Sequence, residues 1–479
     1  MCLNRNRQYF IFFTLLVFAL IFHLVGCFYL YDFENDEGGW LINAKNYVLF
    51  GRYTLEGAYY TALSPLNTFL HIPLFRIFGP SIFLGRYVSI TFALLTLALF
   101  FRLVKNKYGL AVSGLACATI IVNGLYNKIT TLAVLESKLH FLLILSVCFC
   151  LSPKRWVRNC AFLPFALALA FKPSAIYFIF PLIYAIVYQD NESVIAKWVF
   201  RIRLIDILLF LGGTFIISGV FFYAAYLCEP DNFLYWGLKA HLSGRMDIRY
   251  LLMNSAQVGL VCKLIYFIWR SPVSSLFFSL GFIFALKKQE KTVIDKFLLI
   301  WIFTELIFFL FQFYVSVNYF IDLLFPLSVF FAQFIISSVR SLRIDRLRRG
   351  YLLAVIPVSI LVFSEVGSSL YYFLAIKPER PAIKSSQWLK QEKLPYELIL
   401  SPAQIAIDIP VKTMITSNIL RVSELLEKKE VSFPLLCVMQ SQAANYYPED
   451  YILLKDKGRF IKTIGYFWFY EIPGPMGAG

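Results

Sequence analysis

Long apolar runs alternate with short polar loops along the chain up to residue 376. A helix that crosses a membrane needs about 20 mostly apolar residues, with about 17 as the usual minimum. By this measure the pattern predicts roughly eleven spans, with roughly ten to thirteen compatible with it. The predicted spans are 9–30, 83–103, 109–126, 138–151, 160–171, 174–188, 204–228, 272–286, 297–314, 319–339 and 351–376. We therefore expect an all-α polytopic membrane domain.

Several boundaries in this pattern stay open. Several apolar runs between Gly109 and Tyr188 are shorter than the usual minimum, so their ends are poorly defined. Another apolar run, 251–269, contains Asn254, Gln257 and Lys263. Because polar side chains are costly inside a bilayer, we interpret this run as lying at the membrane interface.

The pattern changes after residue 376. Short strand-like runs occur at 398–401 and 467–470, and helix-like runs at 384–392 and 419–429. These lengths are typical of a soluble mixed domain rather than of membrane spans. The sequence therefore predicts a transmembrane domain, residues 1–376, followed by a small soluble α/β domain, residues 377–479.

Composition agrees with a membrane protein. Hydrophobic residues make up 59% of the 479 residues and charged residues 15%, whereas a soluble domain carries about 25% charged residues. This excludes a cytosolic enzyme, a disordered chain and a disulfide-rich secreted module. The net charge of +16 is concentrated in alternate loops, which is a topology signal and a contact with anionic lipids rather than a nucleic-acid footprint.

The basic loops place the N-terminus in the cytoplasm and the C-terminal domain outside it, in the periplasm or extracellular space. The two longest loops between spans, 31–82 and 229–271, then both lie outside. Long loops in compact proteins are usually functional, so we expect the working face to be extracytoplasmic.

An acidic stretch follows the first span. The sequence Asp32-Phe33-Glu34-Asn35-Asp36-Glu37 carries four carboxylates just beyond the apolar run. Acids close to a membrane are costly unless they are solvated or used. Composition alone leaves open whether this is a solvated loop end or a functional site.

The order of motifs that follows favours function. Asp36-Glu37-Gly38, Ser64-Pro65-Leu66, Phe78-Gly79 and Arg86 stand in the order of the first external loop of the GT-C glycosyltransferases, and the stretch resembles that loop. The resemblance is to the protein O-mannosyltransferase and lipid A aminoarabinose transferase type. These enzymes move a sugar from a polyprenyl-phosphate carrier onto an acceptor outside the membrane.

Three later motifs extend the resemblance over residues 1–340. They are Leu132 to Glu136, Phe171-Lys172-Pro173, and Asn318-Tyr319-Phe320 with Pro326. Two positions depart from the family. Leu63-Ser64-Pro65-Leu66 replaces a Glu-Lys-Pro-Pro run, so a metal site that some relatives build there is not supported, and Asn318 stands where a Lys or Arg often precedes the late Tyr.

The resemblance implies roles for the acids. Glycosyl transfer needs a base for the acceptor, cations for the leaving phosphate and exclusion of water. We expect Asp36 to be the base, because burial at the mouth of a low-dielectric cavity would raise the pKa of a carboxylate and make it a better base. Glu37 is expected to orient the acceptor. Glu136 is a third catalytic candidate that would hold a cation of the site, or else a solvated helix start.

Further candidates are cations and polar groups of the predicted external loops. Lys172 has the best claim on the donor phosphate, because it precedes Pro173 where a span restarts. Arg245 and Arg249 are four residues apart, which would place both on one helix face. The donor-phosphate candidates are Lys172, Arg86, Arg245, Arg249, Lys128 and Lys45, and the cavity-lining candidates are Tyr59, Tyr319, Asp322 and His241.

The predicted activity is therefore transfer of a sugar from a polyprenyl-phosphate donor to a glycolipid such as lipid A, a polysaccharide or a protein, by an inverting hexosyl or pentosyl transferase. The alternatives are a flippase or transporter of lipid-linked saccharide, and a structural or receptor membrane protein whose C-terminal domain binds a partner. We expect membrane lipids but no nucleic acid as partners, and a bacterial inner membrane as the location. No cofactor is expected to be required, and a divalent cation is an alternative that no ligand cluster in the sequence supports.

Overall fold

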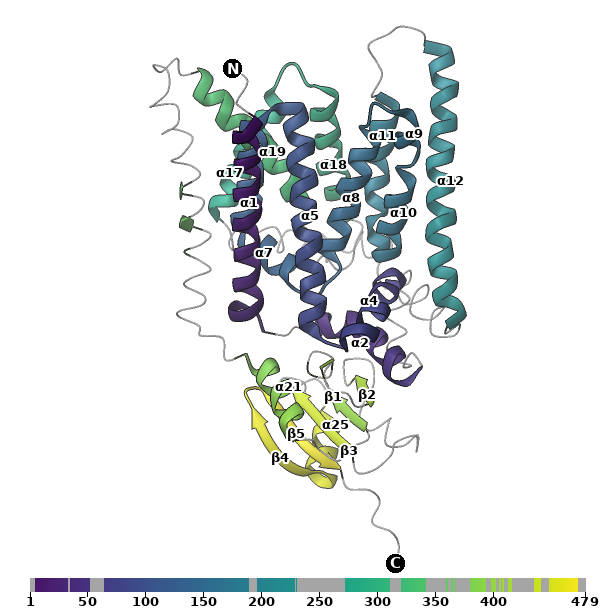
Figure 1. Ribbon diagram of the computed structural model, residues 1–479, viewed down its shortest axis with the longest axis vertical. Coiled ribbons are helices and arrows are strands. Elements are labelled where there is room, and N and C mark those ends of the chain that lie inside the picture. Colours follow the sequence, from purple (N-terminus) through teal and green to yellow (C-terminus); the bar gives the residue numbers. More distant parts are fainter. Residues whose placement is uncertain are drawn as a thin grey trace, which may run out of the picture.

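A computed structural model describes most of the chain. The described residues are 5–32, 35–51, 64–188, 196–228, 272–310, 320–341, 380–392, 398–401, 407–408, 412–415, 435–440 and 448–472, with a few single residues between them. The N-terminus and the C-terminal part lie at opposite ends of the molecule (Figure 1). We call these the N-terminal end and the C-terminal end.

A bundle of apolar helices forms the larger part. Within the described residues, four helical segments are long and apolar enough to cross a membrane, or five if one bent pair counts as a single span. The protein is thus an integral membrane protein. The four segments belong to α1 (Arg5–Val25) with its wider final turn η1 (Gly26–Leu30), α5 (Ile82–Tyr108), α12 (Ala196–Cys228) and α19 (Ile321–Ser341).

Shorter helices complete the bundle. They are α6 (Leu110–Val122), α7 (Gly124–Thr131), α8 (Glu136–Cys150), α9 (Arg155–Asn159), α10 (Phe162–Phe171), η3 (Pro173–Phe178), α11 (Ile179–Tyr188), α17 (Pro272–Lys287) and α18 (Val293–Leu310). The predicted spans at 351–376 and the interfacial run at 251–269 lie almost entirely outside the described residues. The span count of about eleven therefore stays a prediction.

The predicted span 109–126 is not straight. The chain bends by 70° between α6 and α7. The break falls at Asn123, whose side-chain oxygen accepts a hydrogen bond from the Tyr126 backbone N–H at 2.9 Å. Asn favours this capping position because its side chain satisfies a backbone donor that a helix start leaves without a partner. The last three residues of the predicted span therefore belong to a separate helix, α7, that is bent away from α6.

A buried carboxylate ties helices together at the N-terminal end. Asp295 is 1% exposed and accepts hydrogen bonds from Tyr108 of α5 at 2.9 Å and from Lys288 at 2.7 Å. Gln333 of α19 donates to it at 3.3 Å, and Thr292 caps the start of α18 through the same carboxylate. This cluster, which we call the Asp295 cluster, joins α5, α18 and α19.

The C-terminal unit, residues 380–472, contains a five-stranded mixed sheet. Its strand order is β2-β1-β3-β5-β4, from β1 (Leu398–Ser401), β2 (Lys412–Ile415), β3 (Leu435–Gln440), β4 (Arg459–Ile464) and β5 (Phe467–Ile472). Strands β1, β2 and β3 are parallel, and β5 pairs antiparallel with β3 and β4. Helices α21 (Pro381–Glu392) and α25 (Pro448–Lys457) pack against β4 and β5.

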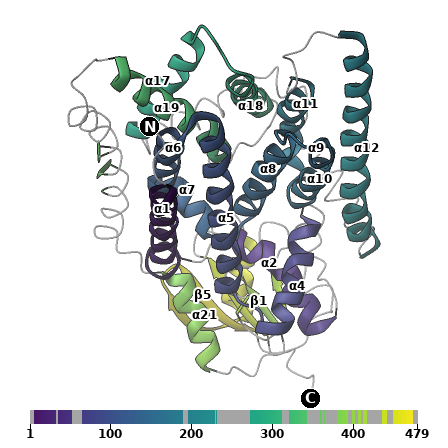
Figure 2. The same cartoon turned by 45° about the horizontal axis from the view of Figure 1, so that its top comes forward.

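Two helices lie between the bundle and this sheet (Figures 1 and 2). They are α2 (Asn35–Phe50) and α4 (Pro65–Phe78), both from the loop predicted at 31–82. One apolar cluster joins side chains of α2, α4 and α5 to side chains of the C-terminal unit. The loop that carries the acidic motif and the C-terminal unit therefore share one packed core.

Candidate active site

A fully buried ion pair organises the acidic motif. Glu37 lies in the first turn of α2, and Arg86 lies on α5 one turn after its start; both are 0% exposed. The Arg86 Nε and Nη2 groups donate to the two carboxylate oxygens of Glu37 at 2.8 and 2.7 Å. This two-bond geometry matches the guanidinium fork and is the strong form of the contact.

Arg86 also closes the end of the first span. It donates to the backbone carbonyls of Cys27 and Tyr31 at 3.1 and 3.0 Å through Nη1, and to that of Asp32 at 2.6 Å through Nη2. The last carbonyls of a helix lack partners within the helix and carry partial negative charge. Together with Glu37 these carbonyls use all five N–H groups of the guanidinium.

The same pair holds residues 132–135, which belong to the Leu132–Glu136 motif. The Ala133 N–H donates to Glu37 Oε1 at 2.7 Å. Close approach is needed here, because a Cβ at Gly85 would lie 2.8 Å from the Ala133 Cβ and 2.8 Å from Leu41 Cδ1. Only glycine therefore lets α2, α5 and the 132–135 segment meet at this point.

Glu37 and Arg86 consequently differ from their sequence-based roles. Glu37 was expected to orient the acceptor and Arg86 to bind the donor phosphate. In the structure both carboxylate oxygens of Glu37 accept hydrogen bonds from within the protein, and every Arg86 N–H group is used there. The sequence indicated that both residues matter but not that they bind each other.

Asp36 is placed differently from its neighbour. It lies in the first turn of α2, directly before the buried Glu37, and its side chain is exposed. The expected burial of this carboxylate is therefore not seen. Because the next residue is fixed by the ion pair with Arg86, the backbone that carries Asp36 is firmly positioned.

A second ion pair joins two other predicted site residues. Lys172 Nζ lies 2.9 Å from Glu136 Oε1, with the two side chains 13% and 11% exposed. Glu136 begins α8, and Lys172 follows the end of α10. Proline disfavours helical backbone in the residue before it, and Lys172, which precedes Pro173, has φ −154° and ψ 107°. Pro173 therefore ends α10 and turns the Lys172 side chain out of the helix.

Electrostatics keep Glu136 ionised. Burial opposes the charged form, but the neighbouring ammonium of Lys172 and its hydrogen bond outweigh burial and lower the pKa of Glu136 below its usual 4.5. Glu136 was expected to hold a cation of the site, and the structure places the cation of Lys172 beside it.

A third polar cluster lies one helical turn further along α8. Asp322, in the first turn of α19, is bonded to Tyr177 of η3 and contacts the imidazole of His140. His140 is one turn after Glu136, so both project from the same face of α8. Asp322 was expected to line a cavity, and it is instead 6% exposed and engaged by these two partners. His140 and Tyr177 were not predicted, although the four-residue spacing from Glu136 was visible in the sequence.

Two further lysines are buried, of which Lys138 was not predicted and Lys45 was expected as a donor-phosphate cation. Lys138 donates to Ser89 Oγ at 3.0 Å and to the Val134 carbonyl at 2.7 Å, which fixes the 132–135 segment from its other side. Lys45 of α2 is 0% exposed, and burial lowers its pKa to about 7 against the raising effect of Asp408 in the C-terminal unit. Such burial of a lysine cannot be read from one sequence, because it depends on packing against distant segments.

The remaining predicted residues are partly placed. Lys128 lies half-buried on α7. Tyr59, His241, Arg245, Arg249 and Tyr319 lie outside the described residues. Among the residues that the structure does describe, no three His, Cys, Asp or Glu side chains gather as a metal site.

Comparison with solved structures identifies the architecture. ArnT from Cupriavidus metallidurans, solved bound to undecaprenyl phosphate, superposes with TM-score 0.65 and 12% identity, over 97% of this chain and 99% of that one. The apo form of ArnT gives TM-score 0.67 at 12% identity, over 97% and 98% of the two chains. The Archaeoglobus fulgidus oligosaccharyltransferase gives TM-score 0.56 and 11% identity, over 97% of this chain and 75% of that one.

The chain has the GT-C fold. The resemblance inferred from the sequence motifs is confirmed at this level. No protein-family model matches the sequence, and a search of curated proteins finds no relative. At 12% identity the likeness shows the fold and does not by itself assign roles to residues. Within this GT-C fold, the residues of the two ion pairs come from the loops that the motifs singled out.

Proposed function

We propose that this protein transfers a sugar from a polyprenyl-phosphate donor to an acceptor at the extracytoplasmic face of the membrane. The observation that carries the proposal is the position of Asp36. Its exposed carboxylate stands at the start of α2, on backbone fixed by the buried Glu37–Arg86 pair, in a chain with the GT-C fold.

The solved neighbours support a lipid-linked donor. ArnT was solved with undecaprenyl phosphate, and an archaeal oligosaccharyltransferase, AglB, was solved with a dolichol phosphate and an inhibitory peptide. For this chain a polyprenyl-phosphate sugar is therefore the proposed donor. A glycolipid such as lipid A, a polysaccharide and a protein all remain acceptor classes for the experiment to separate.

The proposed reaction is a single displacement. The acceptor hydroxyl or amine attacks the anomeric carbon of the donor sugar while the bond from that carbon to the phosphate oxygen breaks. The polyprenyl phosphate leaves with the bonding electron pair, and Asp36 takes the acceptor proton. One displacement inverts the anomeric configuration. Positioned general-base help of this kind is typically worth ~10²–10⁴ in rate.

Lys172 is the proposed ligand of the leaving phosphate. Its ammonium is partly exposed and balanced by Glu136, so it is charged and accessible at the same time. A cation beside the departing oxygen stabilises the charge that develops in the transition state. Glu136 acts through Lys172 by holding it in place. Glu37 and Arg86 are proposed to frame the site rather than to touch substrate.

The location follows the predicted topology. The acidic loop and the C-terminal unit pack against each other at one end of the bundle, opposite the N-terminus (Figure 1). With a cytoplasmic N-terminus, as the charge pattern predicts, both would be periplasmic or extracellular. A bacterial inner membrane is the proposed setting.

The test uses purified full-length protein in liposomes with envelope lipids as acceptors. Radiolabelled polyprenyl-phosphate sugars (mannose, aminoarabinose, galacturonic acid and arabinose) are supplied one at a time. We expect label transfer from one donor, and a fall of ~10²–10⁴-fold in Asp36→Asn. Glu392→Gln is the matched control, because Glu392 is an exposed carboxylate at the end of α21.

Two outcomes would contradict the proposal. Equal transfer by wild type and Asp36→Asn would remove Asp36 from the mechanism. Movement of intact donor across the bilayer without any transfer would instead identify a flippase. Cysteine labelling of an Asp36→Cys variant from outside sealed cells checks which face carries the site.

A further inference from the structure

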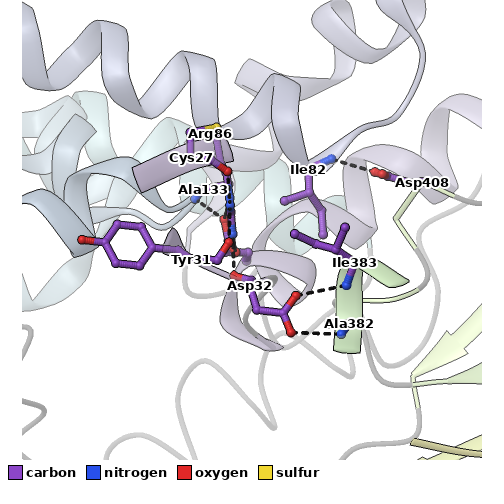
Figure 3. Close-up of polar contacts among 10 residues, drawn as sticks. Cys27, Tyr31, Asp32, Ile82, Arg86, Ala133, Ala382, Ile383 and Asp408 are labelled. Atoms are coloured by element: carbon purple, nitrogen blue, oxygen red, sulfur yellow. Dashed lines mark hydrogen bonds and ion pairs between the residues drawn. The ribbon is translucent and has the colours of Figure 1, made fainter. Parts of the chain in front are cut away.

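Two carboxylates, one from the bundle and one from the C-terminal unit, form hydrogen bonds across the junction between these two parts (Figure 3). Asp32, at the end of the first span, accepts hydrogen bonds from the backbone N–H groups of Ala382 and Ile383 at 2.9 and 3.0 Å. Asp408, in the C-terminal unit, accepts one from the Ile82 N–H at 2.9 Å.

Each carboxylate caps a helix of the other part. Ala382 and Ile383 lie in the first turn of α21, and Ile82 is the first residue of α5. The first N–H groups of a helix have no partner within it, and an acidic side chain at that position satisfies them and complements the helix dipole. The exchange is therefore reciprocal, and neither helix start is complete without the other part of the chain.

Both contacts lead to the buried ion pair. The Asp32 backbone carbonyl accepts a hydrogen bond from Arg86, while its side chain binds α21. Asp32 lies shortly before Glu37 in the sequence, and Ile82 lies one helical turn before Arg86. The C-terminal unit therefore binds both the end of the first span and the start of α5, and these two segments together fix the start of α2.

Apolar packing adds to these hydrogen bonds between the bundle and the C-terminal unit. Leu41 of α2, Ile82 of α5 and Ala133 share one buried cluster with residues of the C-terminal unit. Its members from that unit include Ala382, Ile383, Leu389, Ile405, Ile407, Leu436, Val438, Phe467 and Phe469. Polar caps fix direction and register, whereas burial of apolar area supplies the association.

We propose that the C-terminal unit is a positioning element of the active site, acting through Asp32 and Asp408. The two carboxylates hold the end of the first span and the start of α5, and so set the place of α2 and of Asp36. Neither residue touches substrate. This inference rests on the proposed sugar transfer and assigns to the C-terminal unit a part in the rate of that reaction.

The first test needs no variant. Hydrogen exchange on the full-length wild-type protein should show protected amides at Ala382, Ile383 and Ile82, all in first turns that would exchange rapidly without a cap. Rapid exchange at all three amides would overturn the proposal irrespective of any activity.

The second test separates kcat from KM. Asp32→Ala and Asp408→Ala should each lower kcat for sugar transfer about 10-fold or more, because displacement of a catalytic group by ~1 Å costs ~10²-fold. The KM for the donor should change by less than about twofold, because Lys172 is untouched. A variant that merely folded poorly would yield fewer active molecules, so kcat is expressed per folded molecule from monodisperse protein.

Conservative variants supply the rescue. Asp408→Asn keeps the single oxygen that binds Ile82 and should retain wild-type kcat. Asp32→Asn keeps one of two acceptors and should fall between Ala and wild type. Glu471→Gln is the matched control, because this carboxylate pairs with Arg459 within the sheet.

The outcomes are distinct from those of the proposed function. If wild type transfers no sugar, the proposed function fails. If wild type transfers sugar and Asp36→Asn does not, while Asp32→Ala and Asp408→Ala keep wild-type kcat, only the positioning role is overturned.

Discussion

The two ion pairs at the C-terminal end of the bundle differ in how far their side chains remain accessible to solvent and ligands. Glu37 and Arg86 are both 0% exposed, and besides binding each other they form hydrogen bonds with η1, with the two residues after Leu30 and with the 132–135 segment. Glu136 and Lys172 are 11% and 13% exposed and join the ends of α8 and α10. We call Glu37–Arg86, whose side chains are fully buried, the closed pair, and Glu136–Lys172, whose side chains are partly exposed, the open pair.

This difference separates an ion pair with a structural role from one that can bind a substrate. Removing two charges from water costs several kcal/mol per ion, which only a complete set of hydrogen bonds offsets. Arg86 has such a set, so binding a phosphate would require breaking it. Lys172 keeps solvent access and can exchange part of its contact with Glu136 for an anionic ligand. A basic residue in the right loop is thus not sufficient to define a phosphate ligand.

The largest expected effect comes from opening the closed pair. Arg86→Gln leaves Glu37 buried without its cation and should lower the free energy of unfolding by about 3–5 kcal/mol. Thermal unfolding in detergent measures this. Arg459→Gln is the comparison, because Arg459 and Glu471 are 76% and 18% exposed in their pair and its loss should cost below about 1 kcal/mol. Similar losses in the two variants would contradict the distinction.

The next effect concerns the close approach around the closed pair. Gly85→Val places side-chain atoms where Ala133 and Leu41 already lie, and overpacking of this kind costs about 1–3 kcal/mol. Gly212→Ala in α12 is the control, since nothing lies within 4 Å of its added Cβ. Alanine there should be neutral or stabilising. Unfolding midpoints of the two variants give the comparison directly.

The open pair should affect activity as well as stability. Lys172→Gln is expected to lower the free energy of unfolding by about 1–3 kcal/mol, less than Arg86→Gln, because the two side chains are mostly but not fully buried. The KM for the lipid-linked donor should rise about tenfold, equivalent to about 1.4 kcal/mol of binding. Lys172→Arg keeps the charge and should retain most of the affinity. An unchanged donor KM in Lys172→Gln would assign the phosphate to another cation.

The smallest effect is a pH dependence. The folded-state pKa of Glu136 lies below its usual 4.5, since the ammonium of Lys172 outweighs the opposing effect of burial. The unfolded chain therefore binds this proton at a higher pH than the folded one. The stability from ionised Glu136 is complete well above pH 4.5 and is lost as pH falls through the lowered value. Glu136→Gln should remove this acid-side slope, as unfolding measurements between pH 3 and 6 would show.

The periodicity of apolar residues and a few short motifs predicted much of the fold. Apolar runs correctly placed α1, α5, α12 and α19, because a helix in lipid must be apolar over its whole length. Pro173 marked the end of α10 and the turn at Lys172, since proline restricts the backbone before it. Asn123, a favoured capping residue, was a visible signal for the 70° bend that the span prediction missed.

Partner choice was not predictable in the same way. Glu37 and Arg86 were both singled out, but a sequence does not state that a carboxylate in one loop will meet a guanidinium on the following helix. Asp32 and Asp408 are separated by most of the chain and act on backbone groups, which leave no side-chain signature. His140 and Lys138 were hidden because burial of a polar residue depends on segments distant in sequence.

The Asp295 cluster bears on how a long isoprenoid could enter. It joins α5 to α18 and α19 through Tyr108, the last residue of α5, whereas the Glu37–Arg86 pair lies near the start of that helix. Helices pinned at one end separate by splaying at the other. Admission of a bulky lipid tail should therefore widen the bundle beside the acidic loop, while the opposite end acts as a fixed pivot.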